Sequence, residues 1–189
     1  MVIFDPYSDR LARDIRNGLS SAFVNELTRN VDGPLSTVAD DWLSMAPAPI
    51  YQTYIKQRLS LYRRAIGEIR AGHVVDPRHQ AICLWNLGLF FEMHELLETI
   101  WQKTCEPERS ALKGWIQAAG VYEHFHRGKV DAARRLARKA EMHLRKGRRF
   151  LGFISNLDQL IEAVANPTMA NSGFSGVRLV GRVEVDPNA

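Results

Sequence analysis

The stretch from Phe90 to Trp101 reads FFEMHELLETIW, and it decides the fold of the chain. Its apolar residues recur at intervals of three and four, as one face of an amphipathic helix requires. A helical step of about 100° per residue places two titratable side chains, His94 and Glu98, on the same stripe as Phe90, Leu97 and Trp101. We therefore predict a helix whose core-facing side carries a histidine and a carboxylate.

Helical patterns continue on both sides of this stretch. They predict helices over residues 8–27, 37–45, 50–70, 108–126, 131–146 and 155–165, with a short helix carrying Ala81 to Trp85 before the quoted one. Ser8, Thr37 and Asp76 are the expected caps, and Gly88 is expected to provide a tight turn or a close contact between helices. The fold class is therefore all-α, a compact multi-helix bundle built on helical hairpins with an irregular C-terminal arm.

Breaks in these patterns suggest four parts. We expect an N-terminal helical extension over 1–46, a connecting helix over 47–75, a helical core over 76–152, and a C-terminal helix and tail over 153–189. The proline-containing run at 46–49 is the best candidate for a linker, because proline disfavours helix at the residue before it. Within 108–126, small residues should allow close approach of another helix; these are Gly114, Ala118, Ala119 and Gly120.

Composition narrows the functional class. The 189 residues are 46% hydrophobic, which is enough for an ordinary hydrophobic core that needs no disulfide or structural metal ion for stability. Cys83 and Cys105 stand singly, and neither a signal peptide nor a run of eighteen apolar residues is found. We therefore expect a cytoplasmic protein with no membrane association. The GxxxxGK, GxGxxG and GxSxG motifs are absent, which argues against the common nucleotide-binding and serine-hydrolase classes.

A polar cluster is the candidate site. On the helix over 108–126, Gln117 and His124 share a stripe, so face-to-face packing would bring them to His94 and Glu98. Glu95 and Trp101 would lie near the rim of this cluster.

Three interpretations of the cluster remain open. The first is a buried hydrogen-bond network that fixes the register of the helices. The second is a metal site formed by His94, Glu98 and His124, although HExxH spacing is absent. The third is general acid–base catalysis by a His–Glu pair. We predict no cofactor, and a divalent metal ion is the only ligand of that kind that would suit the cluster.

Positive charge is concentrated near the C-terminal end of the core. Residues 127–149 hold ten Lys or Arg and two acids, although the net charge of the chain is only +4. A solvated helix face is the ordinary explanation, and nucleic-acid binding is the functional one. The basic patch comprises Arg134, Arg135, Arg138, Lys139, Arg145 and Arg149.

These residues resemble a known family. Members of the bacterial and archaeal domain-of-unknown-function 309 family carry NxGx[FY]FExHExLExxW, then GxIQ, then a histidine shortly before RGN. The resemblance covers about 76–151, and the matching positions are Asn86, Gly88, Phe90, Phe91, Glu92, His94, Glu95, Leu97, Glu98, Trp101, Gly114, Ile116, Gln117, His124, Arg127 and Gly128. The chain departs from the pattern at Trp115 and Lys129. The resemblance implies a compact helical fold and assigns no activity.

The sequence leaves the function open between classes of protein. Our leading hypothesis is a non-catalytic protein-interaction or scaffold module, whose partner is an unidentified protein or a second copy of the chain. The alternatives are a metal-dependent or acid–base enzyme using His94, Glu98 and His124, and nucleic-acid binding through the basic helix over 131–149.

Overall fold

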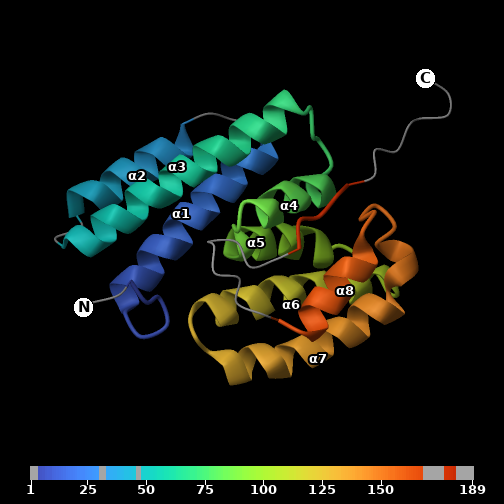
Figure 1. Cartoon of the computed structure of the whole chain (residues 1–189). Coiled ribbons are helices and arrows are strands. Elements are labelled where there is room, and N and C mark those ends of the chain that lie inside the picture. Colours follow the sequence, from blue (N-terminus) through green and yellow to red (C-terminus); the bar gives the residue numbers. More distant parts are fainter. Residues whose placement is uncertain (1–3, 30–32, 46–47, 168–176, 182–189) are drawn as a thin grey trace. The chain divides into compact units, whose positions relative to one another are not determined.

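Helices account for all the named elements of the computed structural model, which describes residues 4–29, 33–45, 48–167 and 177–181. They are α1 (Arg10–Arg29), α2 (Pro34–Met45), α3 (Pro49–Ala71), α4 (Pro77–Asn86), α5 (Phe90–Trp101), α6 (Glu108–His126), α7 (Val130–Lys146), the 3-10 helix η1 (Arg148–Phe150) and α8 (Leu157–Ala165) (Figure 1). The all-α prediction is confirmed. None of the described helices has the length and apolarity needed to cross a lipid bilayer.

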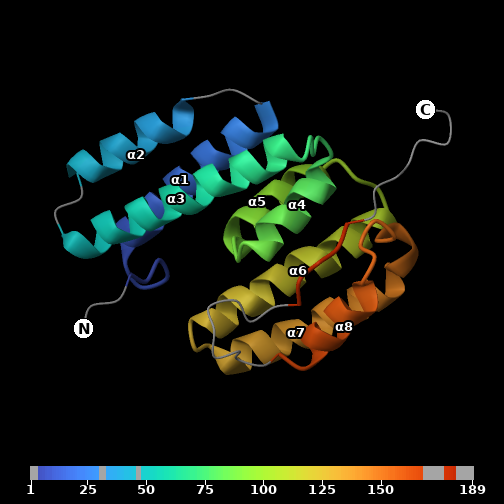
Figure 2. The same ribbon diagram turned by 45° about the horizontal axis from the view of Figure 1, so that its top comes forward.

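The chain divides into two compact units, Met1–His73 and Val74–Ala189. Unit 1 contains α1, α2 and α3, each of which contacts the other two (Figure 2). Its core includes Ile15, Leu19 and Phe23 of α1, all fully buried, and the Phe23 ring stacks on Tyr62 of α3 with centroids 4.3 Å apart. The apolar stripe expected in the first helix is therefore the stripe that α1 buries.

The N-cap of α1 is Asp9, where we had expected Ser8. The Asp9 carboxylate accepts hydrogen bonds from the backbone N–H groups of Leu11, at 2.9 Å, and Ala12, at 3.3 Å. The Ser8 hydroxyl instead donates to Asp5 at 2.7 Å. A carboxylate at the N-cap also complements the positive end of the helix dipole, which a hydroxyl does only weakly.

The start of α2 also differs from the prediction. The helix begins at Pro34, three residues before Thr37, because proline at the first helical position gives up no hydrogen bond. The Thr37 hydroxyl bonds the carbonyl of Gly33 within the first turn. After α2, residues 46 and 47 of the expected linker lie outside the described part of the chain, and α3 packs with α1 and α2 in the same unit.

Unit 2 begins with the helical hairpin of α4 and α5. Asp76 caps α4 as predicted, accepting a hydrogen bond from the backbone N–H of Arg78 at 3.0 Å, with Pro77 in the first turn. Gly88 has a φ of 70° between the two helices, which a residue with a side chain rarely adopts. The turn predicted at Gly88 is therefore confirmed.

Helix α6 packs against α5 on one side and α7 on the other. Aromatic rings fill the α5 side, where Phe90 stacks on Tyr122 at 5.2 Å and both meet Trp85 edge-on. The α7 side is closely packed, since a Cβ atom built on Gly114 would lie 2.8 Å from His143 Cβ. The close approach predicted from the small residues of this helix is confirmed.

The described part of the C-terminal arm, residues 177–181, is extended and held by side-chain amides. Asn86 donates to the carbonyl of Leu179 at 2.9 Å and accepts from its N–H at 2.8 Å. Asn156 bonds the carbonyl of Arg178 and the N–H of Val180 in the same manner. The rest of the predicted arm lies outside the described residues.

Candidate metal centre

Helix α5 turns a different face to the core from the one we predicted. Its buried residues are Phe90, Glu92, Met93, Leu96 and Leu97. His94 and Glu98 are half-buried, so the expectation that they face the core is wrong. Seven of the twelve residues of FFEMHELLETIW are apolar, so two neighbouring stripes fit the helical period almost equally well.

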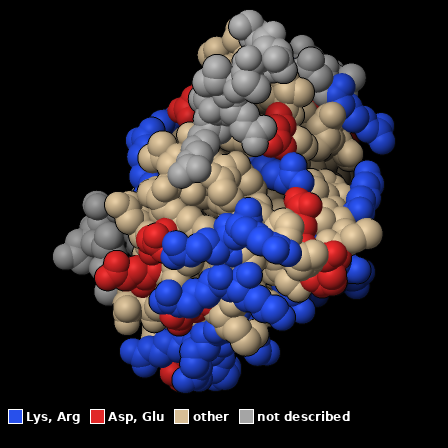
Figure 3. All heavy atoms as spheres, turned by 90° about the vertical axis from the view of Figure 1, so that its right-hand side faces the viewer, with Lys and Arg blue, Asp and Glu red and all other residues tan. Residues whose placement is uncertain are grey.

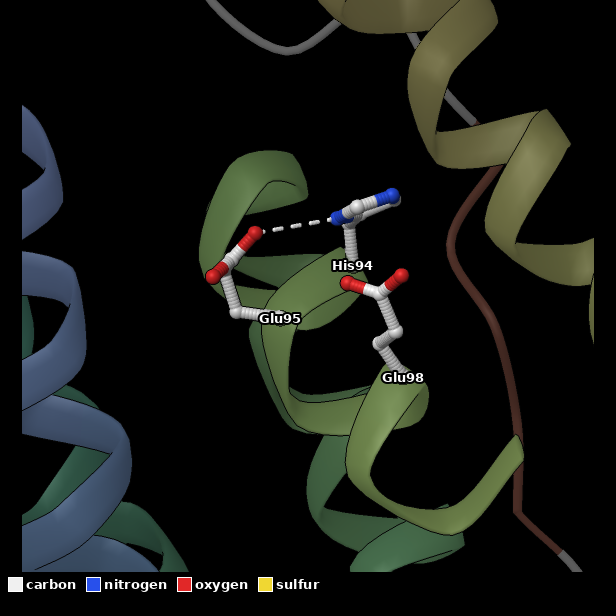
Figure 4. A group of neighbouring side chains, drawn as sticks. All are labelled: His94, Glu95 and Glu98. Carbon is white, nitrogen blue, oxygen red and sulfur yellow. Dashed lines mark hydrogen bonds and ion pairs between the residues drawn. The ribbon is translucent and has the colours of Figure 1, made fainter. Parts of the chain in front are cut away.

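The structure brings three side chains of α5 together. One ligand atom from each of His94, Glu95 and Glu98 lies within 4.8 Å of the others, and these are the only metal-capable His, Cys, Asp and Glu side chains that gather in threes within the described residues. Figure 4 shows them on one side of the helix, with the Glu98 carboxylate beside the imidazole. His94 Nδ1 lies 3.2 Å from Glu95 Oε1, and both side chains are about one-third exposed, at 37% and 35%.

The Glu98 carboxylate makes no hydrogen bond or ion pair with any described residue, although it is half-buried. A partly desolvated carboxylate without a partner is less stable than one that binds a cation. Two ligands of a tetrahedral zinc ion lie about 3.4 Å apart, because each bond is about 2.1 Å long and the angle between the bonds is about 109°. Small rotations of half-exposed side chains would therefore close this group around an ion.

The α6 members of the expected cluster are directed toward α7. Gln117 Oε1 lies 2.8 Å from Nδ1 of His143, a residue of α7. His124 lines a surface hollow together with residues of α7, and it does not belong to the metal-capable group. The expected convergence of four side chains, His124 as a metal ligand included, is therefore wrong. The physical reason is that the polar stripe of α6 lies on its α7 side.

Trp101 ends α5 one turn beyond Glu98. The guanidinium carbon of Arg109 lies 4.2 Å above the Trp101 ring, a cation–π contact that links the end of α5 to the start of α6. The buried indole Nε1 has no hydrogen-bond partner among the described residues. Trp101 thus borders the metal-capable group through its position on the helix and holds the α5–α6 connection.

The structural roles of two residues of the site region were not predicted from the sequence. Glu92 is fully buried, and the sequence of α5 alone gives no signal that separates it from the half-buried Glu98. His143 has no motif around it, but Gly114 and His143 meet because small residues bring α6 and α7 together. Burial lowers the pKa of His143, and the positive charge of the nearby Lys113 lowers it further.

The predicted basic patch lies on α7 and just after it. Arg134, Arg135, Arg138, Lys139, Arg145 and Arg149 are all exposed. Helix α7 buries a narrow face of small residues and leucine, comprising Ala133, Ala137, Ala140 and Leu144. The patch is therefore the solvent face of this helix, separate from the three side chains of α5.

Unit 2 is thus a helical domain that presents a His–Glu–Glu group on the outer side of its second helix. Residues 79–136, from α4 into α7, match the sequence model of the DUF309 family, whose description is a domain of unknown function. The match of this segment to the family model confirms the resemblance stated from the motifs. No curated protein and no solved structure matches the chain.

Proposed function

We propose that unit 2 is a metal-binding helical module that holds a divalent transition-metal ion between His94, Glu95 and Glu98. The observation that carries this proposal is the grouping of one imidazole and two carboxylates within 4.8 Å. Two carboxylates balance the charge of a divalent ion and also suit manganese, and an imidazole favours zinc or iron over calcium or magnesium.

The proposed site would leave part of the coordination sphere open. All three ligands come from one helix and occupy one side of the ion, so water or a substrate would complete its coordination. A bound ion would act as a Lewis acid and would lower the pKa of a coordinated water. Glu95 would either bind the ion or orient the imidazole of His94 through the Nδ1 contact.

Metal analysis of the protein tests the proposal directly. The full chain is produced without a histidine tag, stripped with EDTA, dialysed, and titrated with Zn²⁺ and Mn²⁺ by calorimetry. We expect one ion per chain, and we expect His94→Ala and Glu98→Gln each to weaken binding by at least about tenfold. Glu95→Gln should have a smaller effect if Glu95 only orients His94.

His73→Asn is the matched control. His73 is an exposed histidine of unit 1 with a φ of 51°, a conformation that asparagine tolerates well. This variant should bind the ion as the parent does, and circular dichroism should show that every variant keeps its helices. A parent protein that binds neither ion would overturn the proposal and favour the non-catalytic interaction module.

The non-catalytic module is the second candidate function. It is supported by the Gln117–His143 pair, a polar contact between packed helices that fixes their register without any ligand. We also propose a cytoplasmic location, which suits the absence of a disulfide between Cys83 and Cys105.

A further inference from the structure

The outer face of α7 carries exposed cations between Arg134 and Lys146. Arg134, Arg135, Arg138 and Lys139 are exposed in its first half, and Arg145 and Lys146 are exposed in its last turn. Arg148 and Arg149 extend the series into η1. Figure 3 shows Lys and Arg side chains gathered on the side of unit 2 where α7 ends.

Most of these cations are not neutralised by the protein. Arg145 pairs with Glu141 at 2.9 Å, and Arg148 pairs with Asp158. By contrast, the four cations in the first half of α7 make no ion pair with any described residue; they are Arg134, Arg135, Arg138 and Lys139. An exposed helix face that only needed solvation would normally alternate charges of both signs. This face keeps a surplus of positive charge available to a partner.

A surface hollow lies beside this basic face of α7. It has a volume of about 500 Å³ and is lined by His124, Ala132, Arg135, Leu136, Arg138 and Lys139. Three cations therefore surround a floor that is partly apolar. Burial and then the charge of Lys129 lower the pKa of His124, which indicates that the basic surroundings disfavour a further positive charge there.

The spacing of the cations matches a linear polyanion. Arg134 and Lys146 are twelve residues apart, so they lie about 18 Å apart along the helix axis. One strand of duplex DNA presents about five phosphates over that length, at about 3.4 Å per phosphate along the axis. We propose that the outer face of α7 binds the phosphate backbone of a nucleic-acid duplex, independently of the metal ion proposed for α5.

Two other anionic partners fit the face less well. A helix that lies on a lipid surface inserts its apolar side, but α7 buries that side, including Leu144, within unit 2. Proteins that bind single strands stack the bases on aromatic side chains, and the exposed residues of α7 contain none. A duplex, which is bound mainly through its phosphates, needs neither feature.

Fluorescence anisotropy with a labelled 20-base-pair DNA duplex tests the proposal on the full chain. The measurements are made in EDTA, so that loss of the metal ion cannot explain the result. With about four phosphate contacts, raising the salt from 50 to 200 mM should weaken binding roughly a hundredfold. The double variant Arg135→Gln/Arg138→Gln should reduce the slope of log K against log salt by about 2.

A control and three competitors decide the outcome. Lys56→Gln/Arg63→Gln removes two exposed cations from α3 of unit 1 and should leave duplex binding unchanged. Equal weakening by this control would overturn the proposal, as would the absence of any binding below 100 mM salt. Tighter binding of a single strand, of polyglutamate or of phosphatidylserine vesicles would assign the face to that partner and would also overturn it.

Discussion

The two sides of helix α6 are built on different principles. Toward α5, large rings set the separation of the helices, with Trp85, Phe90 and Tyr122 in mutual contact at 5.0–5.2 Å between centroids. Toward α7, glycines let the backbones approach, and the polar side chains of Gln117 and His143 meet there. Because α6 directs this polar pairing toward α7, the polar residues of α5 are left for solvent or a ligand.

Removing a ring from the α5 side should produce the largest loss of stability. Phe90 is 1% exposed and touches both other rings of the cluster, so Phe90→Ala would leave a cavity that neighbouring rings cannot fill. We expect the free energy of unfolding to fall by about 3–5 kcal/mol, measured by urea denaturation. Phe91→Ala, at a half-buried position next to it, is the control and should lose clearly less. Equal losses would show that the ring cluster is not what holds α5 to α6.

Adding a methyl group at Gly147, on the α7 side of α6, should produce the next largest loss of stability. A Cβ atom on Gly147 would lie 2.4 Å from Ala111 Cβ and 2.6 Å from Ala111 Cα, so the backbone of one helix must move. We expect Gly147→Ala to lower the free energy of unfolding by about 1–3 kcal/mol. Thermal and urea denaturation would measure the loss.

The same substitution in α3 provides the control for Gly147→Ala. A Cβ atom on Gly67 would meet no atom within 4 Å, and Gly67 lies inside a helix. Gly67→Ala should therefore stabilise unit 1 by about 0.5–1 kcal/mol, because alanine loses less backbone entropy than glycine. If Gly147→Ala were also neutral or stabilising, the two sides of α6 would not differ in the way described above.

The two sides also differ in how well the sequence predicts them. The close packing of α6 on α7 follows from the small residues at Gly114 and Gly120, because glycine at helical spacing has few other uses inside a helix. Most helix bounds likewise follow from apolar spacing, proline and glycine, although the starts of α1 and α2 differ from the predicted ones. These signals are local, and a local signal can be read from one segment at a time.

The candidate site was predicted in part, because the direction of a side chain depends on the neighbouring helix. His94, Glu95 and Glu98 were identified from helical spacing, but the half-exposed positions of His94 and Glu98 were not. Their helix is apolar on most sides, so its own sequence cannot show that Glu92 is buried while Glu98 is not. The Asn86 amide, which holds a segment 93 residues away, has no local signal either.

The smallest expected effect concerns the pH dependence of the α6–α7 contact. Burial lowers the pKa of His143, so the folded protein binds a proton there less readily than the unfolded chain does. The stability contributed by this histidine is therefore present above its unfolded pKa of about 6.5 and is lost as the pH falls through the lower folded value. His143→Gln can still bond Gln117 but cannot titrate, so its stability should fall less between pH 7 and pH 5 than that of the parent.

The pKa of His124 is lowered in the same direction, so a double variant with His124→Gln should flatten the profile further. Urea denaturation across this pH range, together with proton NMR titration of the histidines, would measure both. An unchanged profile in His143→Gln would mean that the imidazole of His143 does not contribute to the contact between α6 and α7.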